Sequence, residues 1–242
     1  MKLAVMQPYF LPYLGYFDLA NKVDLWLVYD DSQYIRHGWM NRNRVLDPVS
    51  GWKYIVAPVK KHRLGTPIHQ IQLVTGVDWK TRLCRQLEPY HMDAPHYDTV
   101  IRFLKDALAE CDHNLTNVNT TLFKRTCDFL GITTSIRKYS EMNLPISQTQ
   151  SIEELALAIC REVGATEYIN RPGGAGQFQA ARFARSGVKL TIQSFTNMTY
   201  ACGRFRFEPN MSIIDVMMWN STEEIKRHLD ASCMSDPHAK ES

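Results

Sequence analysis

Polar side chains that could bind or transform a ligand follow two apolar runs near the start of the chain. Gln7, Tyr9 and Tyr13 come after the first run, and Asp30 and Asp31 come directly after the second. If both runs are parallel strands, their carboxyl ends meet at one edge of a sheet, where open α/β sheets bind ligands. We therefore expect these side chains to converge on one ligand-binding crevice.

The two aspartates are candidates for acid–base catalysis. Consecutive residues on extended backbone point to opposite sides. We therefore expect one carboxylate of Asp30 and Asp31 to face the crevice and the other to cap a turn or anchor the next loop. The carboxylate in the crevice could accept a proton from an attacking amine or hydroxyl, or hold a sugar hydroxyl. His37 is a third catalytic candidate, because an imidazole titrates near neutral pH. The alternatives are two solvated turn aspartates and a bystander histidine.

Residues 37–44 carry dense hydrogen-bonding capacity, and we expect them to form a loop that contacts the substrate. Arginine clamps phosphate or carboxylate with two parallel hydrogen bonds, amides both donate and accept, and an indole stacks on a sugar ring or a base. The alternative is a structural loop whose polar groups are tied to one of the aspartates. The candidate substrate contacts in and near this loop are Gln33, Trp39, Asn41, Arg42, Asn43 and Arg44.

Two further polar segments follow expected strands. Lys60 opens the run KKHR and could neutralise a diphosphate, although a solvated charge run explains it equally well. Asn170 and Arg171 precede a glycine-rich turn in which Gly173 and Gly174 could let backbone amides approach a phosphate. A plain flexible turn is the alternative.

The spacing of histidines and cysteines does not suggest a metal site. His91 and His96 are separated by a segment that contains Pro95, so they cannot share a helix face as metal ligands do. The cysteines are scattered without a Cys-x-x-Cys pair, which favours reduced, mostly buried thiols. We expect no metal ion and no tightly bound cofactor.

The elements that must position these residues alternate along the chain, which indicates an α/β fold with a mostly parallel sheet, flanking helices and a helical middle section. We expect one domain at 1–231, a helical insertion or subdomain at 78–130 and a disordered tail at 232–242. Apolar runs and alternation predict strands at 2–6, 25–29, 52–59, 68–74, 132–139, 168–170 and 188–195. Capping signals and amphipathic spacing predict helices at 14–22, 78–90, 97–111, 119–130, 151–163, 177–186, 212–219 and 222–229.

The composition is that of an ordinary globular protein, with 45% hydrophobic and 22% charged residues and a formal net charge of +3. So weak a net charge argues against a protein that coats DNA. No run reaches the roughly 18 apolar residues that a membrane-spanning helix needs, and the first apolar run lacks a signal-peptide cleavage site. We therefore expect a cytoplasmic protein that has neither a membrane nor DNA as its partner.

Several blocks of the sequence together resemble the WbqC-like protein family. Three of them resemble the signature that opens these proteins, and two later blocks are also similar. The resemblance spans about residues 1–220 and is closer in the first half. The blocks are MQPYFLPYLGYF at 6–17, YDDSQY at 29–34, WMNRNR at 39–44, YIN at 168–170 with the glycines at 173 and 174, and FEPN at 207–210 through SIID at 212–215.

The resemblance implies a part in the synthesis of O-antigen, lipopolysaccharide or another surface glycan. It implies a transferase that moves an acyl or aminoacyl group to the amino group of a nucleotide-linked sugar. The implied partners are that nucleotide sugar and an activated donor linked to CoA, to a carrier protein or to tRNA. In this hypothesis Asp30 or Asp31 orients or deprotonates the amine, and the amides of Gln7, Asn41 and Asn43 hold carbonyl and hydroxyl groups.

A weaker similarity concerns Tyr13-Leu14-Gly15-Tyr16, which falls where HUP-class nucleotidylyltransferases carry His-x-Gly-His after their first strand. It implies a Rossmann/HUP-like sheet and makes an HUP-type nucleotidyl-transfer or adenylating enzyme an alternative. Both histidines are absent from this sequence, which counts against nucleotidyl transfer itself. A non-catalytic nucleotide-sugar binding protein is a further alternative. The sequence leaves the donor, the acceptor and the oligomeric state open.

Overall fold

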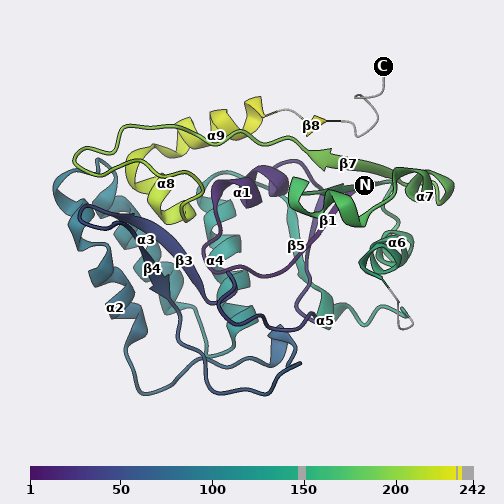
Figure 1. Cartoon of the computed structure of the whole chain (residues 1–242), viewed down its shortest axis with the longest axis horizontal. Coiled ribbons are helices and arrows are strands. Elements are labelled where there is room, and N and C mark those ends of the chain that lie inside the picture. Colours follow the sequence, from purple (N-terminus) through teal and green to yellow (C-terminus); the bar gives the residue numbers. More distant parts are fainter. Residues whose placement is uncertain (147–150, 233, 236–242) are drawn as a thin grey trace.

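A six-stranded, mostly parallel sheet lies at the centre of residues 1–146, 151–232 and 234–235, which the computed structural model describes (Figure 1). Neighbouring strands are parallel except at one edge, where the last strand runs antiparallel. The order is that of a doubly wound Rossmann-type sheet, and the predicted fold class is confirmed. From edge to edge the strands are β5 (Ser135–Lys138), β2 (Leu25–Val28), β1 (Lys2–Met6), β6 (Glu167–Asn170), β7 (Lys189–Gln193) and β8 (Met234–Ser235).

The short strand β8 falls inside the segment predicted to be a disordered tail. Its two residues pair with Ile192 and Gln193 of β7. Residues 233 and 236–242 of that expected tail lie outside the described residues. The prediction of disorder therefore does not describe Met234 and Ser235.

Helices cover both faces of the sheet because its strands send alternate apolar side chains to opposite sides. Leu3, Leu25 and Leu27 pack into one core with α6 and α7. Ala4 and Trp26 point the other way, into a larger core with α1, α4, α8 and α9. Burial on both faces explains the near-continuous apolar runs of β1 and β2. The helices are α6 (Ile152–Val163), α7 (Ala180–Arg185), α1 (Leu14–Ala20), α4 (Leu115–Phe129), α8 (Ile213–Trp219) and α9 (Thr222–Ala231).

A separate antiparallel hairpin, β3 (Arg42–Asp47) with β4 (Gly51–Val56), stands apart from the main sheet in the described structure. The Asp47 side chain fixes its turn by accepting hydrogen bonds from the amides of Val49 and Ser50, at 3.1 and 2.9 Å. The hairpin lies with α2 (Trp79–Gln86) and α3 (Tyr97–Ala109) at one end of the molecule, and α6 lies at the other (Figure 1). The chain thus places a polar hairpin beside the mouth of the sheet.

Three sequence expectations about this region hold only in part or not at all, since residues 37–41 form the expected loop and residues 52–56 an expected strand, but the rest differs. The segment 37–44, expected to be a loop, runs into β3, and the segment 52–59, expected to be a strand of the main sheet, supplies β4 instead. The two segments pair with each other because the tight turn joins them. The expected strand at 68–74 is the 3-10 helix η1 (Ile68–Gln70) followed by isolated bridges. Its alternation of apolar residues reflects packing against α4.

The helical middle section begins where the sequence predicts. Asp78 caps α2 by accepting a hydrogen bond from the Thr81 amide at 3.0 Å. Helix α4 starts before the predicted residue 119, because Asn114 caps it by accepting from the Asn117 amide at 3.1 Å. The 3-10 helix η2 (Glu88–Met92) joins α2 to α3.

The carboxylate of Asp215 ties α8 to the hairpin. It is fully buried and accepts hydrogen bonds from the Leu46 amide at 3.1 Å, from the hydroxyl of Tyr200 at 2.8 Å and from the hydroxyl of Tyr90. The capping box predicted for residues 212–215 does not form, since Ser212 accepts from another amide and the acid is used in the core. Asp215 is therefore a structural group.

Candidate functional site

The strand order determines where a crevice opens. From β1 the chain adds β2 and β5 on one side of the sheet, and it later adds β6 and β7 on the other side. Loops that leave the carboxyl ends of β1 and β6 diverge from this point, and open α/β sheets bind ligands in the crevice between such loops. Segments 7–13 and 170–177 occupy this position.

A cavity of about 390 Å³ lies at this point, and we call it the sheet-edge cavity. Gln7 and Tyr9 reach it from the loop after β1, and Asn170 and Arg171 reach it from the end of β6. The Gln7 amide donates a hydrogen bond to the Ser32 hydroxyl at 3.1 Å. The cavity thus combines amides and a guanidinium with aromatic walls. Its other lining residues include Tyr16, Tyr29, Ser32, Gly173 and Gly174.

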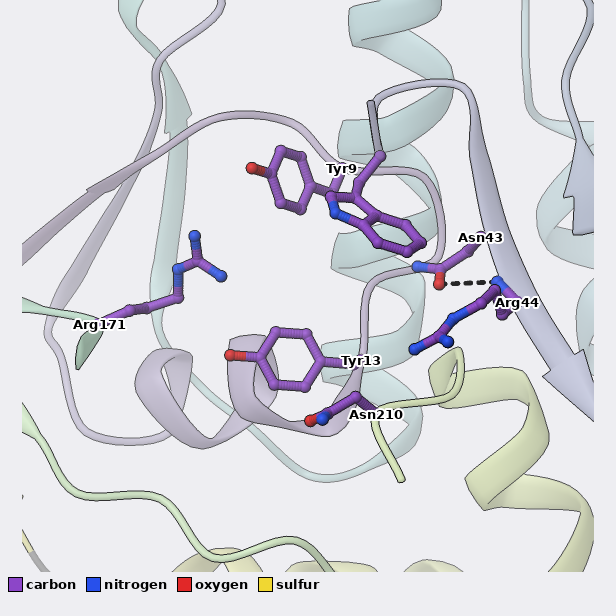
Figure 2. A pocket seen from close by; sticks show the side chains of 7 residues that line it. Tyr9, Tyr13, Asn43, Arg44, Arg171 and Asn210 are labelled. Carbon is purple, nitrogen blue, oxygen red and sulfur yellow. Dashed lines mark hydrogen bonds between the residues drawn. The ribbon is translucent and has the colours of Figure 1, made fainter. Parts of the chain in front are cut away.

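A second cavity of about 350 Å³ lies between the β1 loop and the hairpin, and we call it the hairpin cavity. Tyr9 and Arg171 line both cavities, so the two cavities are adjacent, and we call them together the cleft. Figure 2 shows Arg171 and Arg44 on opposite sides of the hairpin cavity, with their guanidinium groups directed inward and the rings of Tyr9 and Tyr13 between them. The remaining lining residues are Trp39, Asn43 and Asn210.

Arg171 stands at the junction of the two cavities. Its guanidinium lies 5.1 Å from the centre of the Tyr16 ring and 5.8 Å from that of Tyr9, within the range of cation–π attraction. Although burial opposes the charged form, the neighbouring Tyr16, Tyr13 and Tyr9 raise the pKa of Arg171 above its ordinary value. Burial also raises the pKa of Tyr16, and the charge of Arg171 opposes this shift. The cleft therefore contains a charged Arg171 guanidinium packed beside the rings of Tyr9 and Tyr16.

Arg44 is held on the opposite wall by aromatic rings of the hairpin. Its guanidinium lies 5.6 Å from the ring of Trp39 and 5.1 Å from that of Trp52. The Nε atoms of both Arg44 and Arg171 are buried without a hydrogen-bond partner in the described structure. Buried polar groups usually find a partner, so both guanidinium groups keep unsatisfied hydrogen-bonding capacity beside the hairpin cavity.

Asn43 fixes the distance between the hairpin and the β1 loop. Its Nδ2 donates to the carbonyl oxygens of Phe10 and Leu11, at 3.1 and 2.9 Å, and its Oδ1 accepts from the Arg44 amide at 2.8 Å. All polar atoms of this buried amide are thus used in holding backbone. Asn43 positions Arg44 and the tyrosine-bearing loop and has little capacity left for substrate.

Two glycines give aromatic and amide side chains of the cleft their room. A Cβ atom on Gly15 would lie 2.6 Å from Cζ of Tyr13, so the ring of Tyr13 can lie over the start of α1 only because residue 15 has no side chain. A Cβ atom on Gly174 would lie 2.8 Å from Nδ2 of Asn170. Contacts this short require the neighbour to move. Gly15 and Gly174 therefore matter because their lack of a side chain leaves room for Tyr13 and Asn170.

The charged side chains that line the cleft are all positive. Among the described residues that line its two cavities there is no aspartate, glutamate or histidine. Two arginines, amides and aromatic rings remain. Arginine binds phosphate and carboxylate with paired hydrogen bonds, and aromatic rings stack on bases and sugars. This geometry suits an anionic ligand that carries a ring.

A model of the WbqC-like protein family matches residues 7–227. The chain belongs to this family. It is also 30% identical over 221 residues to the uncharacterized protein Rv1507c of Mycobacterium tuberculosis (strain ATCC 25618 / H37Rv), a similarity that covers 89% of this chain and 92% of that protein. No solved structure gives a significant match to the chain. The family predicted from the sequence blocks is thus confirmed, and the matched range includes every described lining residue of the cleft except Val5 and Met6.

The two aspartates predicted to be catalytic lie outside the cleft of this WbqC-like protein. Asp30 is fully buried, and its carboxylate accepts hydrogen bonds from the amide and the hydroxyl of Ser140, at 3.0 and 2.7 Å, at the start of α5 (Tyr139–Met142). Asp31 is exposed, with Oδ1 3.6 Å from Nδ1 of His69. The two carboxylates do diverge as expected, but neither belongs to the described lining of the two cavities.

His37 and Asn41 are also placed structurally. His37 is exposed and adopts a positive φ of 61°, and its carbonyl accepts a hydrogen bond from Arg42. Asn41 is saturated, because it accepts from the Tyr34 hydroxyl at 2.8 Å and donates to the carbonyl of Ala57 at 3.0 Å. These contacts shape the loop before β3. The geometry does not support the catalytic and substrate-binding roles predicted for the two residues.

Three other predicted contacts lie away from the described cavity walls. Arg42 stacks 4.1 Å from the centre of the Tyr54 ring on the hairpin. Gln33 bridges to Pro67, and Lys60 is exposed on the loop after β4. The residues that the fold does bring to the cleft are Gln7, Tyr9, Tyr13, Trp39, Asn43, Arg44, Asn170, Gly173 and Gly174.

Sequence reasoning missed Tyr16 and Asn210 and gave Arg171 too small a part. Tyr16 lies inside the opening signature, and its burial on α1 hides it from a search for exposed polar residues. Asn210 has a positive φ of 58° at the end of the FEPN block, where it turns the chain toward the hairpin cavity. Both residues lie in blocks that carry the family resemblance, and this was the available signal.

Within the described ranges, none of the helices combines the length and the apolar character needed to cross a bilayer. The same ranges contain no group of three or more histidine, cysteine, aspartate or glutamate side chains arranged to hold a metal ion.

Proposed function

We propose that this WbqC-like protein is a transferase that moves an acyl or aminoacyl group to the amino group of a nucleotide-linked sugar, in the synthesis of a surface glycan such as O-antigen. One observation carries the proposal: Arg44 and Arg171 direct their guanidinium groups into one cleft, between aromatic rings and without an acidic residue among the described lining. A diphosphate flanked by a base and a sugar matches this arrangement, since guanidinium groups bind phosphate oxygens in pairs.

The two cavities divide such a substrate between them. The diphosphate lies between Arg44 and Arg171, and the base stacks on Trp39 at the exposed end of the hairpin cavity. The sugar then enters the sheet-edge cavity, where the amides of Gln7 and Asn170 contact its hydroxyl groups. The shared position of Arg171 between the cavities sets the distance from phosphate to sugar.

The reaction needs only a positioned amine and a stabilised carbonyl oxygen. The amine nitrogen forms a bond to the acyl carbon, the bond from that carbon to the donor's sulfur or oxygen breaks, and the proton lost by nitrogen leaves on the released thiol or hydroxyl. The amide of Gln7 or Asn170 donates to the carbonyl oxygen as negative charge develops on it. Because the described lining offers no carboxylate or imidazole, catalysis would depend mainly on orientation.

The first experiment measures the binding of UDP- and dTDP-linked amino sugars by titration calorimetry and the product mass after addition of acyl-CoA or aminoacyl donors. Arg171→Gln should weaken binding by about 2 kcal/mol, roughly thirtyfold in Kd, because it removes charged hydrogen bonds to phosphate. Arg102→Gln, on the exposed surface of α3, is the matched control and should change Kd by less than about twofold. Equal affinity of wild type and Arg171→Gln would refute the proposed phosphate site.

Two other functions make different predictions for the same sample. The Rossmann-type strand order and the position of Tyr13, Gly15 and Tyr16 at the cleft favour an HUP-type nucleotidyl-transfer or adenylating enzyme as the second candidate. That enzyme would release pyrophosphate from ATP or CTP. A non-catalytic nucleotide-sugar binding protein agrees with the lack of acid–base groups in the described lining, and it would bind the sugar without any change in its mass.

A further inference from the structure

Basic residues are concentrated in one part of this chain. Residues 32–77 contain seven lysines and arginines and a single acidic residue, whereas the rest of the chain contains twenty-one lysines and arginines and twenty-four acidic residues. The single acid, Asp47, is paired with Lys53 at 3.0 Å. The small net charge of the whole protein therefore conceals a strongly positive segment and a negative remainder.

The fold brings four cations of this segment, Arg36, Lys60, Lys61 and Arg63, onto two neighbouring loops. The loop before β3 and the loop after β4 run antiparallel, with a bridge between Gln33 and Pro67 and a hydrogen bond of 2.9 Å from the Tyr34 amide to the Thr66 carbonyl. Farther along, Arg36 donates to the His62 carbonyl at 3.4 Å. We call the exposed residues of these loops the basic platform. They are Ile35, Arg36, Lys60, Lys61, Arg63 and Leu64.

The platform has apolar side chains among its charges. Leu64 is 90% exposed and Ile35 is 54% exposed. The register of the bridge places Ile35 opposite Gly65, the chain neighbour of Leu64, so both exposed aliphatic residues belong to this pair of loops. Aliphatic side chains give a protein partner an apolar anchor, but they offer no ring on which a nucleic-acid base could stack. The mixture favours an acidic protein over RNA.

The platform is continuous with the cleft. The loop that carries Ile35 and Arg36 leads to Trp39, which is 38% exposed and lines the hairpin cavity beside Arg44. The carbonyl of Trp39 accepts a hydrogen bond of 2.9 Å from the Phe10 amide, which ties this loop to the segment that bears Tyr9. A partner bound on the platform would therefore have the opening of the cleft at its edge.

We propose that the basic platform docks an acidic carrier protein that presents the acyl donor as a thioester on a phosphate-bearing arm. The inference rests on the proposed function, since it names the carrier of the acyl group for the same site. The carrier's acidic face meets Arg36, Lys60 and Lys61, and its apolar residues cover Leu64. The arm enters the opening of the cleft beside Trp39 and the bound base, and its thioester reaches the amino group of the sugar. On transfer, the sugar nitrogen bonds to the acyl carbon, the thioester bond breaks, and the carrier's arm leaves as a free thiol with the proton.

The test measures the Kd of the full-length chain for a phosphopantetheinylated, acidic acyl carrier protein by fluorescence anisotropy. The triple variant Lys60→Glu/Lys61→Glu/Arg63→Glu should weaken binding by at least about tenfold, because charge reversal opposes an acidic face. The control Arg102→Glu/Lys105→Glu/Lys124→Glu makes the same charge change on exposed positions of α3 and α4 and should change Kd by less than about threefold. Thermal denaturation checks that both variants are folded.

A second variant separates docking from general attraction between charges. Leu64→Ser keeps the net charge and should still weaken carrier binding by about fivefold, because it removes the apolar anchor. Equal losses in the platform and control variants, or no loss with Leu64→Ser, would overturn the docking surface. Tighter binding of tRNA than of the carrier, lost in the platform variant, would overturn the choice of an acidic protein.

The proposed function and the docking surface fail in different ways. If nucleotide sugars do not bind but the carrier still docks on the platform, the proposed function fails and the docking surface stands. If nucleotide sugars bind and accept an acyl group from acyl-CoA, but the platform variant loses no affinity for the carrier, the docking surface fails and the proposed function stands.

Discussion

The ends of β2 and β6 are alike in sequence and differ in the folded protein. A polar pair lies at the carboxyl end of each strand: Asp30-Asp31 follows β2 after Tyr29, and Asn170-Arg171 spans the end of β6. At the end of β2 the first aspartate is buried against Ser140, whereas at the end of β6 both residues line a cavity. The surroundings of each strand explain the difference. Strand β6 borders β1 at the point where the order of strand addition reverses and a crevice opens. The end of β2 is instead covered by α5, which carries Ser140. A polar strand end becomes a site only beside the crevice.

The largest effect that tests this comparison is on stability. Asp30→Ala should lower the free energy of unfolding by about 2–3 kcal/mol, because it removes the two hydrogen bonds that the amide and hydroxyl of Ser140 donate to a buried carboxylate. Nucleotide-sugar affinity of the folded protein should stay within about twofold of wild type, since Asp30 is outside the described cavity lining. Urea denaturation and titration calorimetry measure the two quantities.

The neighbouring aspartate provides the control for this result. Asp31→Ala changes an exposed carboxylate and should cost less than about 0.5 kcal/mol of stability. A stable Asp30→Ala protein that had lost its ligand affinity would reverse the comparison and return a functional role to the end of β2.

Much of the main sheet and part of the cleft were predictable from local sequence. The apolar runs of β1 and β2 identify buried parallel strands, and the polar residues that follow β1 give Gln7, Tyr9 and Tyr13 as cleft residues. Asn170 and the glycines after β6 were found by the same reasoning. These predictions succeed because strand ends and turns are encoded by residues close together in the chain.

The remaining errors concern contacts between distant residues. Asn41 and Asn43 look equally suited to bind substrate, yet Asn41 is saturated by Tyr34 and Ala57, and Asn43 holds the backbone of the β1 loop. The carboxylate of Asp30 is taken up by hydrogen bonds from Ser140, which lies 110 residues away in the sequence. No local pattern reveals such partners. The segment of β4 could have paired with the main sheet, and it pairs with β3 because a tight turn joins the two.

A pair of glycine variants sharpens the comparison on the β6 side, with a smaller expected effect. Gly174→Ala would place a Cβ atom 2.8 Å from Nδ2 of Asn170, so the amide must move within the sheet-edge cavity. We expect nucleotide-sugar affinity to fall by about tenfold, close to 1.4 kcal/mol. Gly176→Ala adds the same methyl group where no heavy atom lies within 4 Å and outside the described cavity lining, and it should leave Kd within about twofold. Equal affinities for the two variants would show that the position of Asn170 does not matter for binding.

The smallest expected effect concerns Asp215, which extends the contrast between buried acids and the cationic cleft. Burial raises the pKa of Asp215 above its ordinary value of 3.8, and the hydrogen bonds from Tyr90, Tyr200 and Leu46 oppose the shift without cancelling it. The folded protein therefore holds the proton of this carboxyl more tightly than the unfolded chain does. Stability from this source is fully present below pH 3.8 and is lost as the pH rises through the raised pKa.

Asp215→Asn keeps an oxygen acceptor and removes the titration. The advantage of wild type over this variant in free energy of unfolding should therefore decrease as the pH rises from about 4 toward neutrality, by on the order of 1 kcal/mol or less. Urea denaturation of both proteins at several pH values measures the difference. An advantage that grows with pH would mean that Asp215 is stabilised as a carboxylate, and the tyrosine hydroxyls rather than burial would then set its charge. Either result concerns the packing of α8 on the hairpin, so the affinity of the cleft for nucleotide sugars should not follow the same pH dependence.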